Sequence, residues 1–248
     1  IIVQYFAEPS KMEYYNRGEV PPEIEAHDRV ASHYEVPAIN LAKEVTDRIN
    51  RGEFTWEDDF KDLHPSPFGH RLYRDRIARL FDVSWAAKDL ATIHVSAHTM
   101  PDGIVYPLHY GRGRYVDVQT AEIVNGWNYV DSWNPKDRAG KRKQFVNVPT
   151  LEATEAGAEL VFVFEGRAVG LLVTAGPDAG ILEYSIDGNV YPPLDQFTQW
   201  SAGLHIPWAY MLAVDLAPGE HRLALKTSGE RNAKSTGNVC RIQQFLAN

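Results

Sequence analysis

The chain has a single cysteine among its 248 residues and no long hydrophobic run. The lone Cys240 excludes an intrachain disulfide and leaves the cellular compartment open. The longest apolar runs, such as residues 160–164, are far too short to span a bilayer, and the chain shows no charged-then-apolar signal pattern. We therefore expect no membrane segment, and the sequence indicates no localisation.

Basic side chains are also scarce. The 25 Lys and Arg residues are outnumbered by 33 Asp and Glu, which gives a net charge of −8 and a pI near 5.6. Proteins that bind DNA or RNA present a basic face, so nucleic acid is not an expected partner. The chain contains no Gly-rich phosphate loop or nucleotide fingerprint, and no cofactor is expected. Its length is sufficient for one large or two modest domains.

The amino-terminal third shows an α/β pattern. Residues 1–7, IIVQYFA, form a continuous apolar run, typical of a strand buried on both faces of a parallel sheet. Helical spacing follows over residues 23–33, then a short strand over 36–41 and a helix over 42–49. Because a buried parallel strand needs neighbours on both sides, we expect the chain to be part of a larger domain: a fragment, a cleavage product or an incomplete reading frame.

Residues 8–22 are predicted to form a loop, because Pro9, Gly18 and a pair of prolines punctuate them. A loop at the carboxyl end of a parallel strand faces the ligand crevice of such sheets. Tyr14 and Tyr15 are therefore candidate substrate-binding residues. Packing of this loop over the sheet edge is the alternative interpretation.

The chain is organised around DLHPSPFGH, residues 62–70, which precedes an amphipathic run over residues 71–81. Two prolines hold this stretch away from the helical region, so Asp62 and His64 are expected on a stiff loop. A carboxylate in this position can orient an imidazole that acts as a general base. Capping of the following helix is the alternative role. His70 competes with His64 as the base, and a metal site formed by these side chains fits no recognised zinc spacing.

Residues 56–77, WEDDFKDLHPSPFGHRLYRDRI, resemble the last conserved block of the SGNH (GDSL-type) hydrolases. The strand of residues 1–7 and the segment VASHYEVPAINLAKEV, residues 30–45, support the resemblance. It implies a flavodoxin-like three-layer α/β fold and a Ser-His-Asp triad in which His64 and Asp62 are two of the three members.

The family's GDS-type nucleophile block is absent from this sequence, as are the two blocks that carry its Gly and Asn oxyanion donors. We therefore expect residues 1–84 to be the carboxy-terminal part of the catalytic domain, with the Ser-bearing half missing from the chain. The first strand would then expose an unpaired edge. We predict that this edge pairs with the missing half, with a partner chain, or with the same strand of a second copy in a homodimer.

Further along, short β-rich runs alternate with turn residues, a pattern typical of an antiparallel sandwich. Predicted strands cover residues 158–164, 168–174, 180–186, 209–216 and 220–226. Hairpin turns are expected at Asp187-Gly188 and Pro218-Gly219. Residues 85–150 are expected to be a partly irregular connecting segment, and residues 151–248 an all-β sandwich. The sandwich resembles the jelly-roll modules attached to carbohydrate-active SGNH esterases.

The six tryptophans and twelve tyrosines fit either carbohydrate-facing surfaces or a sandwich core. The most site-like stretch is WSAGLHIPWAY, residues 200–210, in which His205 and Trp208 flank a proline. Both are candidate substrate-binding residues. Further candidates for sugar contact, with core packing or turn capping as the alternative, are Trp127, Trp133, Trp200, Tyr191 and Asp195.

Three functions remain open, each with a carbohydrate or acylated carbohydrate as the expected partner. The first is a carbohydrate-active ester hydrolase, a deacetylase or acyl esterase, with a Ser-His-Asp mechanism. The second is a carbohydrate-binding module with a vestigial hydrolase fragment. The third is a glycoside hydrolase that uses two carboxylates among Glu57, Asp58, Asp59 and Asp62.

Overall fold

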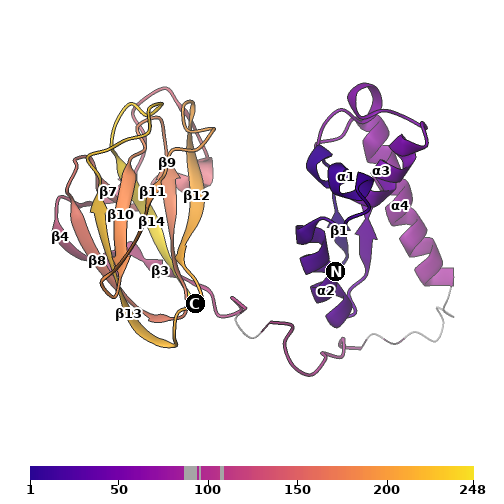
Figure 1. The fold of residues 1–248 in the computed structure, drawn as a ribbon, viewed down its shortest axis with the longest axis horizontal. Coiled ribbons are helices and arrows are strands. Elements are labelled where there is room, and N and C mark those ends of the chain that lie inside the picture. Colours follow the sequence, from indigo (N-terminus) through magenta and orange to yellow (C-terminus); the bar gives the residue numbers. More distant parts are fainter. Residues whose placement is uncertain (87–93, 95, 107–108) are drawn as a thin grey trace. The chain divides into compact units, whose positions relative to one another are not determined.

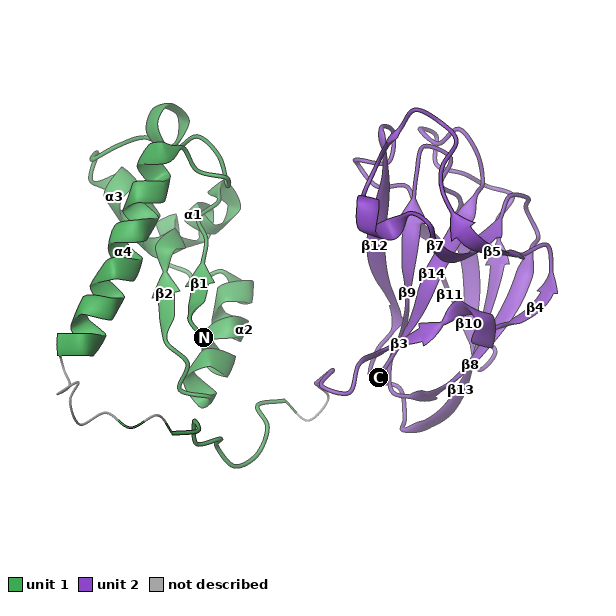
Figure 2. Ribbon diagram, turned by 180° about the vertical axis from the view of Figure 1, so that it is seen from behind, with its two compact units in different colours: residues 1–107 green, residues 108–248 purple. Residues whose placement is uncertain are grey.

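A computed structural model describes residues 1–86, 94, 96–106 and 109–248. The chain divides into two compact units, residues 1–107 and 108–248 (Figure 2). The expected connecting segment, residues 85–150, is in part outside the described residues, at 87–93, 95 and 107–108. No helix among the described residues is both long and apolar enough to cross a membrane.

In its described residues, the first unit combines two short parallel strands with four α-helices and a π-helical turn (Figure 1). Its elements are β1 (Val3–Tyr5), α1 (Pro9–Asn16), α2 (Pro22–His33), β2 (Ala38–Asn40), α3 (Leu41–Asn50), a π-helical turn (Trp56–Phe60) and α4 (Pro67–Ala86). β1 and β2 pair in register from Val3 with Ala38 to Tyr5 with Asn40. The strands and helices predicted from the sequence are present in this unit, although the first strand is shorter than residues 1–7 and α1 is an additional helix.

One prediction in this unit is wrong. Residues 9–16, expected to belong to a loop, form α1, because Pro9 occupies the first helical turn, where a backbone N–H has no intrahelical partner. Pro67 starts α4 for the same reason. The core is built from α3, the π-helical turn and α4, with Leu41 and Phe60 fully buried and the ring of Phe60 against that of Tyr73.

The second unit is a β-sandwich of two sheets (Figure 1). Its strands are β3 (Arg114–Asp117), β4 (Glu122–Asn125), β5 (Asn128–Trp133), β6 (Gly140–Lys141), β7 (Val148–Ala153), β8 (Glu159–Gly166), β9 (Val169–Ala175), β10 (Ile181–Ile186), β11 (Asn189–Asp195), β12 (Leu204–Ala213), β13 (Gly219–Thr227) and β14 (Cys240–Ala247). The smaller sheet has the order β11-β10-β13-β8-β4. The larger has the order β5-β7-β14-β9-β12-β6, and β3 also pairs with β14.

Inward side chains of both sheets form one core. Phe162 of β8 stacks on Phe245 of β14 with ring centroids 4.0 Å apart, which joins the smaller sheet to the larger. Residues 114–150, expected to belong to the connecting segment, instead supply strands β3 to β6 and the first half of β7 of the sandwich. Their pairing with β8 and β14 satisfies edge hydrogen bonds that the carboxy-terminal strands alone would leave open.

One of the two predicted hairpins is confirmed and one is wrong. β10 and β11 pair through Asp187 and Gly188, whose φ angles of 52° and 80° are those of a tight hairpin turn. β12 and β13, in contrast, lie in different sheets. The chain crosses the sandwich near Asp215, and β13 starts at Gly219 opposite Gly166 of β8.

Candidate functional site

A pocket of about 820 Å³ lies in the first unit, where β1 ends. Its lining residues come from β1 and the segment after it, from α1, from the proline-containing loop and from α4: Gln4, Phe6, Ala7, Glu8, Lys11, Leu63, His64, Pro65, His70, Tyr73, Arg74, Ile77, Ala78 and Phe81. We refer to this pocket as the histidine groove. Both histidines that the sequence offers as a general base, His64 and His70, line it.

His64 and Asp62 lie together, but not in a tight pair. The backbone N–H of His64 donates to Asp62 Oδ1 at 3.1 Å, whereas Nδ1 of the His64 ring is 3.6 Å from that oxygen. The side chains are 88% and 64% exposed, respectively. The hydrogen bond from the His64 backbone, with smaller contributions from its ring, lowers the pKa of Asp62 and keeps this carboxylate ionised near neutral pH.

Packing around Ser66 and Gly69 holds the loop that carries His64. Ser66 Oγ donates to the carbonyl of Asp59 and accepts from the backbone N–H of Phe68, so this serine caps α4. A Cβ on Gly69 would lie 2.6 Å from Pro65 Cβ and 2.9 Å from the Phe60 ring. Only glycine therefore lets the first turn of α4 approach the proline that follows His64.

The described residues that line the histidine groove include no serine, threonine or cysteine. Ser66, the serine nearest to His64 in sequence, is engaged as a helix cap. The hydroxyl of Tyr73 accepts from the backbone N–H of Ala7 at 3.0 Å, and burial raises the pKa of this tyrosine. The groove therefore brings two histidines together, but its described lining residues provide no Ser, Thr or Cys hydroxyl or thiol.

Other predicted residues of the first unit lie elsewhere. Tyr14 and Tyr15 are on α1 and do not line the groove; Tyr15 instead accepts a hydrogen bond from Asn40 Nδ2 at 2.8 Å. None of the four carboxylates considered for glycoside hydrolysis lines it either. Asp59 accepts from the backbone N–H of Thr55 at 2.9 Å, so it stabilises the start of the π-helical turn.

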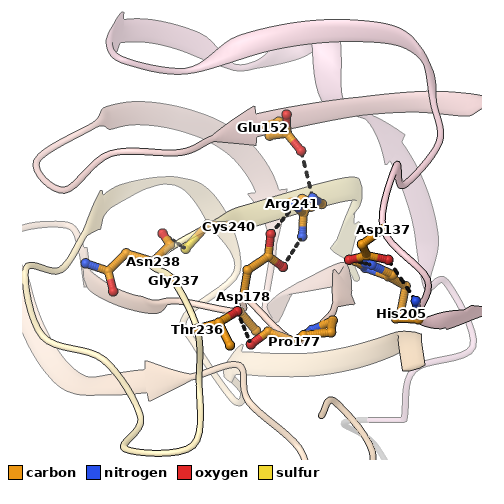
Figure 3. Close-up of polar contacts among 12 residues, drawn as sticks. Asp137, Glu152, Pro177, Asp178, His205, Thr236, Gly237, Asn238, Cys240 and Arg241 are labelled. Atoms are coloured by element: carbon orange, nitrogen blue, oxygen red, sulfur yellow. Dashed lines mark hydrogen bonds and ion pairs between the residues drawn. The ribbon is translucent and has the colours of Figure 1, made fainter. Parts of the chain in front are cut away.

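A second, more polar pocket of about 790 Å³ lies in the sandwich. It is lined by Val130, Ser132, Trp133, Asn134, Pro135, Lys136, Asp137, Glu152, Asp178, His205 and Arg241. We refer to it as the arginine pocket. Its centre is Arg241, which reaches Asp178 on one side and Glu152 on the other (Figure 3).

The charges of this pocket are paired with good geometry. Arg241 donates from Nη1 and Nη2 to the two oxygens of Asp178 at 2.8 and 2.7 Å, and from Nε to Glu152 Oε2 at 2.7 Å. Burial opposes ionisation of Asp178, but hydrogen bonds and charge from Arg241 outweigh it, so the pKa of Asp178 lies below its ordinary value. A bidentate, partly buried pair of this kind fixes the side-chain orientations.

Trp133 and His205 form the base of the arginine pocket. The Arg241 guanidinium lies 5.2 Å above the Trp133 ring, whose indole N–H donates to Glu152 Oε2 at 3.1 Å. The His205 ring packs edge-on against Trp133 and contacts Asp137 Oδ2 through Nε2 at 2.9 Å (Figure 3). Although burial opposes its ionisation, the hydrogen bonds from His205 and a backbone N–H lower the pKa of Asp137.

The structure separates the two residues predicted as a pair on β12. Trp208 lies opposite Val173 and packs against the sandwich core, whereas His205, three residues earlier, faces the arginine pocket on the outer side of the sheet. Trp200 is 46% exposed and contacts the Trp208 ring. Of the other sugar-contact candidates, Trp127 is buried in the core, Tyr191 stacks on Tyr184, Asp195 accepts from Asn232, and Trp133 alone lines the pocket.

Sequence reasoning missed Glu152, Asp178 and Arg241. The sequence carried a signal for two of them, since Glu152 and Arg241 are the only charged residues of strands β7 and β14. Buried charges in strands are rare unless they are paired. Among the described residues, no group of three or more His, Cys, Asp or Glu side chains is arranged to hold a metal ion.

No protein-family model matches the chain, and no curated protein matches it in sequence. The fold of the chain is nevertheless similar to that of solved structures. A crystal structure of a two-domain esterase (CEX) active on acetylated mannans matches 99% of this chain with a TM-score of 0.69 and 16% sequence identity. The same esterase co-crystallised with mannopentaose matches with a TM-score of 0.68, again at 16% identity and 99% coverage, over 71% of that chain.

This likeness shows a shared fold across both units. The chain spans 62% of the length of the first of these esterase structures.

Proposed function

We propose that the first unit carries the His-Asp part of a Ser-His-Asp hydrolase that removes acyl groups from a polysaccharide, and that the serine is supplied by polypeptide outside these 248 residues. His64 is the general base and Asp62 its orienting carboxylate. The observation that carries this proposal is the position of His64. Its imidazole lines the histidine groove, while the ionised carboxylate of Asp62 is 3.6 Å from Nδ1 and does not line the groove.

The chemistry follows from that arrangement. Nδ1 is near Asp62, which leaves Nε2 to accept the proton of a serine hydroxyl as the serine oxygen attacks the acyl carbonyl. The proton then passes from the imidazolium to the departing sugar oxygen. Water, deprotonated by the same imidazole, then attacks the acyl–serine ester; the bond to the serine oxygen breaks, the imidazolium returns the proton to that oxygen, and the acyl group leaves as a carboxylic acid. Asp62 stabilises the imidazolium in both steps.

The apolar lining of the groove favours the proposal that another segment of polypeptide supplies the serine. Phe6, Leu63 and Phe81 line it and are all exposed. Apolar side chains gathered around a catalytic-type histidine indicate a surface that another piece of polypeptide covers. The fold comparison agrees, because the esterase chain is longer than the part that this chain matches. That esterase acts on acetylated mannans, and we propose an acetylated polysaccharide as the substrate class here.

Histidine substitutions in the complete enzyme test the assignment. His64→Ala is expected to lower the rate of acetate release from p-nitrophenyl acetate and acetylated polysaccharide by about 10³-fold or more, since the proton acceptor is lost. His70→Ala, in the same groove, is the matched control and is expected to retain most activity. Near-wild-type hydrolysis by the His64 variant would contradict the proposal, and loss only in the His70 variant would transfer the role to His70.

Labelling with a fluorophosphonate tests the source of the serine separately. Purified residues 1–248 are expected to show no stoichiometric modification by mass spectrometry, whereas the complete enzyme is modified at one serine. Stoichiometric labelling of a serine within residues 1–248 would show that the nucleophile is in this chain after all.

A further inference from the structure

The arginine pocket of the sandwich contains hydrogen-bonding groups that its own contacts do not use. Arg241 is 8% exposed and uses three N–H groups on Asp178 and Glu152. A guanidinium has five such donors, so two remain without a partner among the described residues. Glu152 Oε2 accepts from both Arg241 and Trp133, while Oε1 accepts from no described group. The pocket thus contains a fixed donor and a fixed acceptor side by side.

The rim of the pocket adds further groups of both kinds. Ser132 and Lys136 are exposed and line the pocket, and their side chains form no hydrogen bond or ion pair with another described residue. Asn134 is held in place by Asn147 and by Lys141 Nζ, at 2.9 and 2.7 Å. Its amide therefore has a fixed orientation at the mouth. Because the polar groups on the floor are already ordered, a ligand that binds them costs little further side-chain entropy.

Charge narrows the class of ligand. Three carboxylates, Asp137, Glu152 and Asp178, face two cations, Arg241 and Lys136. The small net negative charge of the pocket disfavours an anionic ligand. A metal ion is also disfavoured, because no group of described side chains is arranged to hold one. Ionised carboxylates only accept hydrogen bonds and a guanidinium only donates them. A neutral hydroxyl group can donate a hydrogen bond to a carboxylate and accept one from the guanidinium. Sugars carry several such hydroxyl groups.

The floor of the pocket also decides how a ligand is held. Trp133 is only 4% exposed, with Arg241 over its face and His205 at its edge. It supports the charged groups and offers no open face on which a sugar ring could stack. Recognition at this pocket is therefore by hydrogen bonds, which favours selection among sugars by the positions of their hydroxyl groups.

We propose that the arginine pocket binds a neutral oligosaccharide segment, with Glu152 Oε1 as the central acceptor and Arg241, Ser132 and Lys136 as donors. The site is argued from the second unit alone, so it goes beyond the proposed ester hydrolysis. The experiment below measures binding of polysaccharide and not ester hydrolysis. Binding at the arginine pocket and hydrolysis at the histidine groove can therefore be confirmed or contradicted separately.

Affinity electrophoresis of residues 1–248 tests this site. Native gels contain the neutral polysaccharides galactomannan, arabinoxylan or mixed-linkage β-glucan, with polygalacturonate and chitosan as charged comparisons. We expect retardation in at least one neutral gel. Lys136→Ala, Ser132→Ala and Glu152→Gln are each expected to weaken retention, by about 10-fold where one well-placed hydrogen bond is lost. Thermal melts of each variant check that the sandwich remains folded.

The opposite sheet supplies matched controls. Glu159 and Lys226 form an ion pair at 3.0 Å and line a separate pocket on the smaller sheet. Glu159→Gln and Lys226→Ala are the same kinds of substitution as Glu152→Gln and Lys136→Ala. They are expected to leave retention by the polysaccharide gels unchanged. The proposal is overturned if no neutral gel retards the protein, if only a charged polymer does, or if folded arginine-pocket variants bind as well as the wild type.

Discussion

Gly176 leaves the space that the His205 ring occupies at the base of the arginine pocket. A Cβ at this position would lie 2.2 Å from Nδ1 of the His205 ring, and His205 is only 2% exposed, so the ring has little room to move. The backbone of Gly176 does not lie in the left-handed region. A substitution here therefore tests steric contact without adding backbone strain.

Gly176→Ala is expected to reduce the free energy of unfolding by about 1–3 kcal/mol, as overpacking of a buried site usually does. Urea denaturation measures the change. In a His205→Ala background the added methyl group has space, so Gly176→Ala should reduce the free energy of unfolding by a smaller amount. Gly203→Ala, where a Cβ meets nothing within 4 Å, is the control and should stay within about 0.5 kcal/mol of the wild type. Equal costs for Gly176→Ala with and without His205 would contradict this account.

Asp62 and His64 illustrate a different property of single residues. Their side chains lie together because they are two positions apart on a loop whose backbone is restricted by prolines. This pairing could be predicted from the sequence. The capping role of Ser66, which removes it as a nucleophile near His64, depends on the carbonyl of Asp59 and became clear only in the structure.

The hairpin of β10 and β11 is connected to β13 by a pH-sensitive contact. Asp187, at the turn, accepts from the backbone N–H of Arg222 at 2.8 Å and contacts His221 Nδ1 at 2.6 Å. The hydrogen bond to Asp187 raises the pKa of His221 above its ordinary value, and the same bond lowers the pKa of Asp187. In the folded state His221 therefore holds its proton more tightly, and Asp187 holds its proton less tightly, than in the unfolded state.

The sign of the pH dependence follows. Because the folded-state pKa of His221 is raised, the pair contributes its full stability below the unfolded pKa of about 6.5 and loses it as the pH rises through the folded pKa. The contribution is also lost below about pH 4, as Asp187 becomes protonated. Between these limits the wild type should be more stable than Asp187→Asn, and the difference should shrink in alkaline solution.

NMR titration of the His221 ring checks this expectation directly. Asn tolerates the positive φ of 52° and can still accept from Arg222, so Asp187→Asn removes mainly the charge. The pKa of His221 should fall in the variant. An unchanged value would show that the backbone carbonyl of Ala217, which His221 Nε2 contacts at 2.8 Å, is responsible instead.

Each of the two units has its own core. The sandwich core draws on both sheets, and the cores of the first unit contain none of its residues. In the first unit, β1 pairs with β2 along one edge, and no described strand pairs with the other. The histidine groove also leaves apolar side chains exposed. The first unit is thus the part of the chain that gains most from a covering partner.

We expect residues 1–248 to self-associate through the first unit in light scattering, and the serine-bearing segment to suppress this association. Phe81→Glu, in the histidine groove, should shift the chain toward monomer because it places a charge on the apolar surface. Val83→Glu, on the same helix and exposed but outside the groove, is the matched control. A wild-type chain that is monomeric at all concentrations would contradict this expectation, including pairing of the first strand in a homodimer.

Much of the local structure could be predicted from the sequence. Apolar runs and turn residues placed β8, β9, β10 and β13 within a few residues, and the Asp-Gly turn predicted the β10–β11 hairpin. These features depend on backbone preferences and side-chain periodicity over fewer than about ten residues. The same applies to the closeness of Asp62 and His64, which are two positions apart on a loop restricted by prolines.

Contacts between distant segments could not be predicted in this way. The arginine pocket joins Asp137, Glu152, Asp178, His205 and Arg241 from separate strands and loops, because two sheets fold over one core and bring those segments to the same outer face. β12 and β13 are consecutive and separated by a Pro-Gly pair, yet they enter different sheets. A turn sequence allows a reversal of the chain, but burial of side chains from distant strands decides which strand becomes the neighbour.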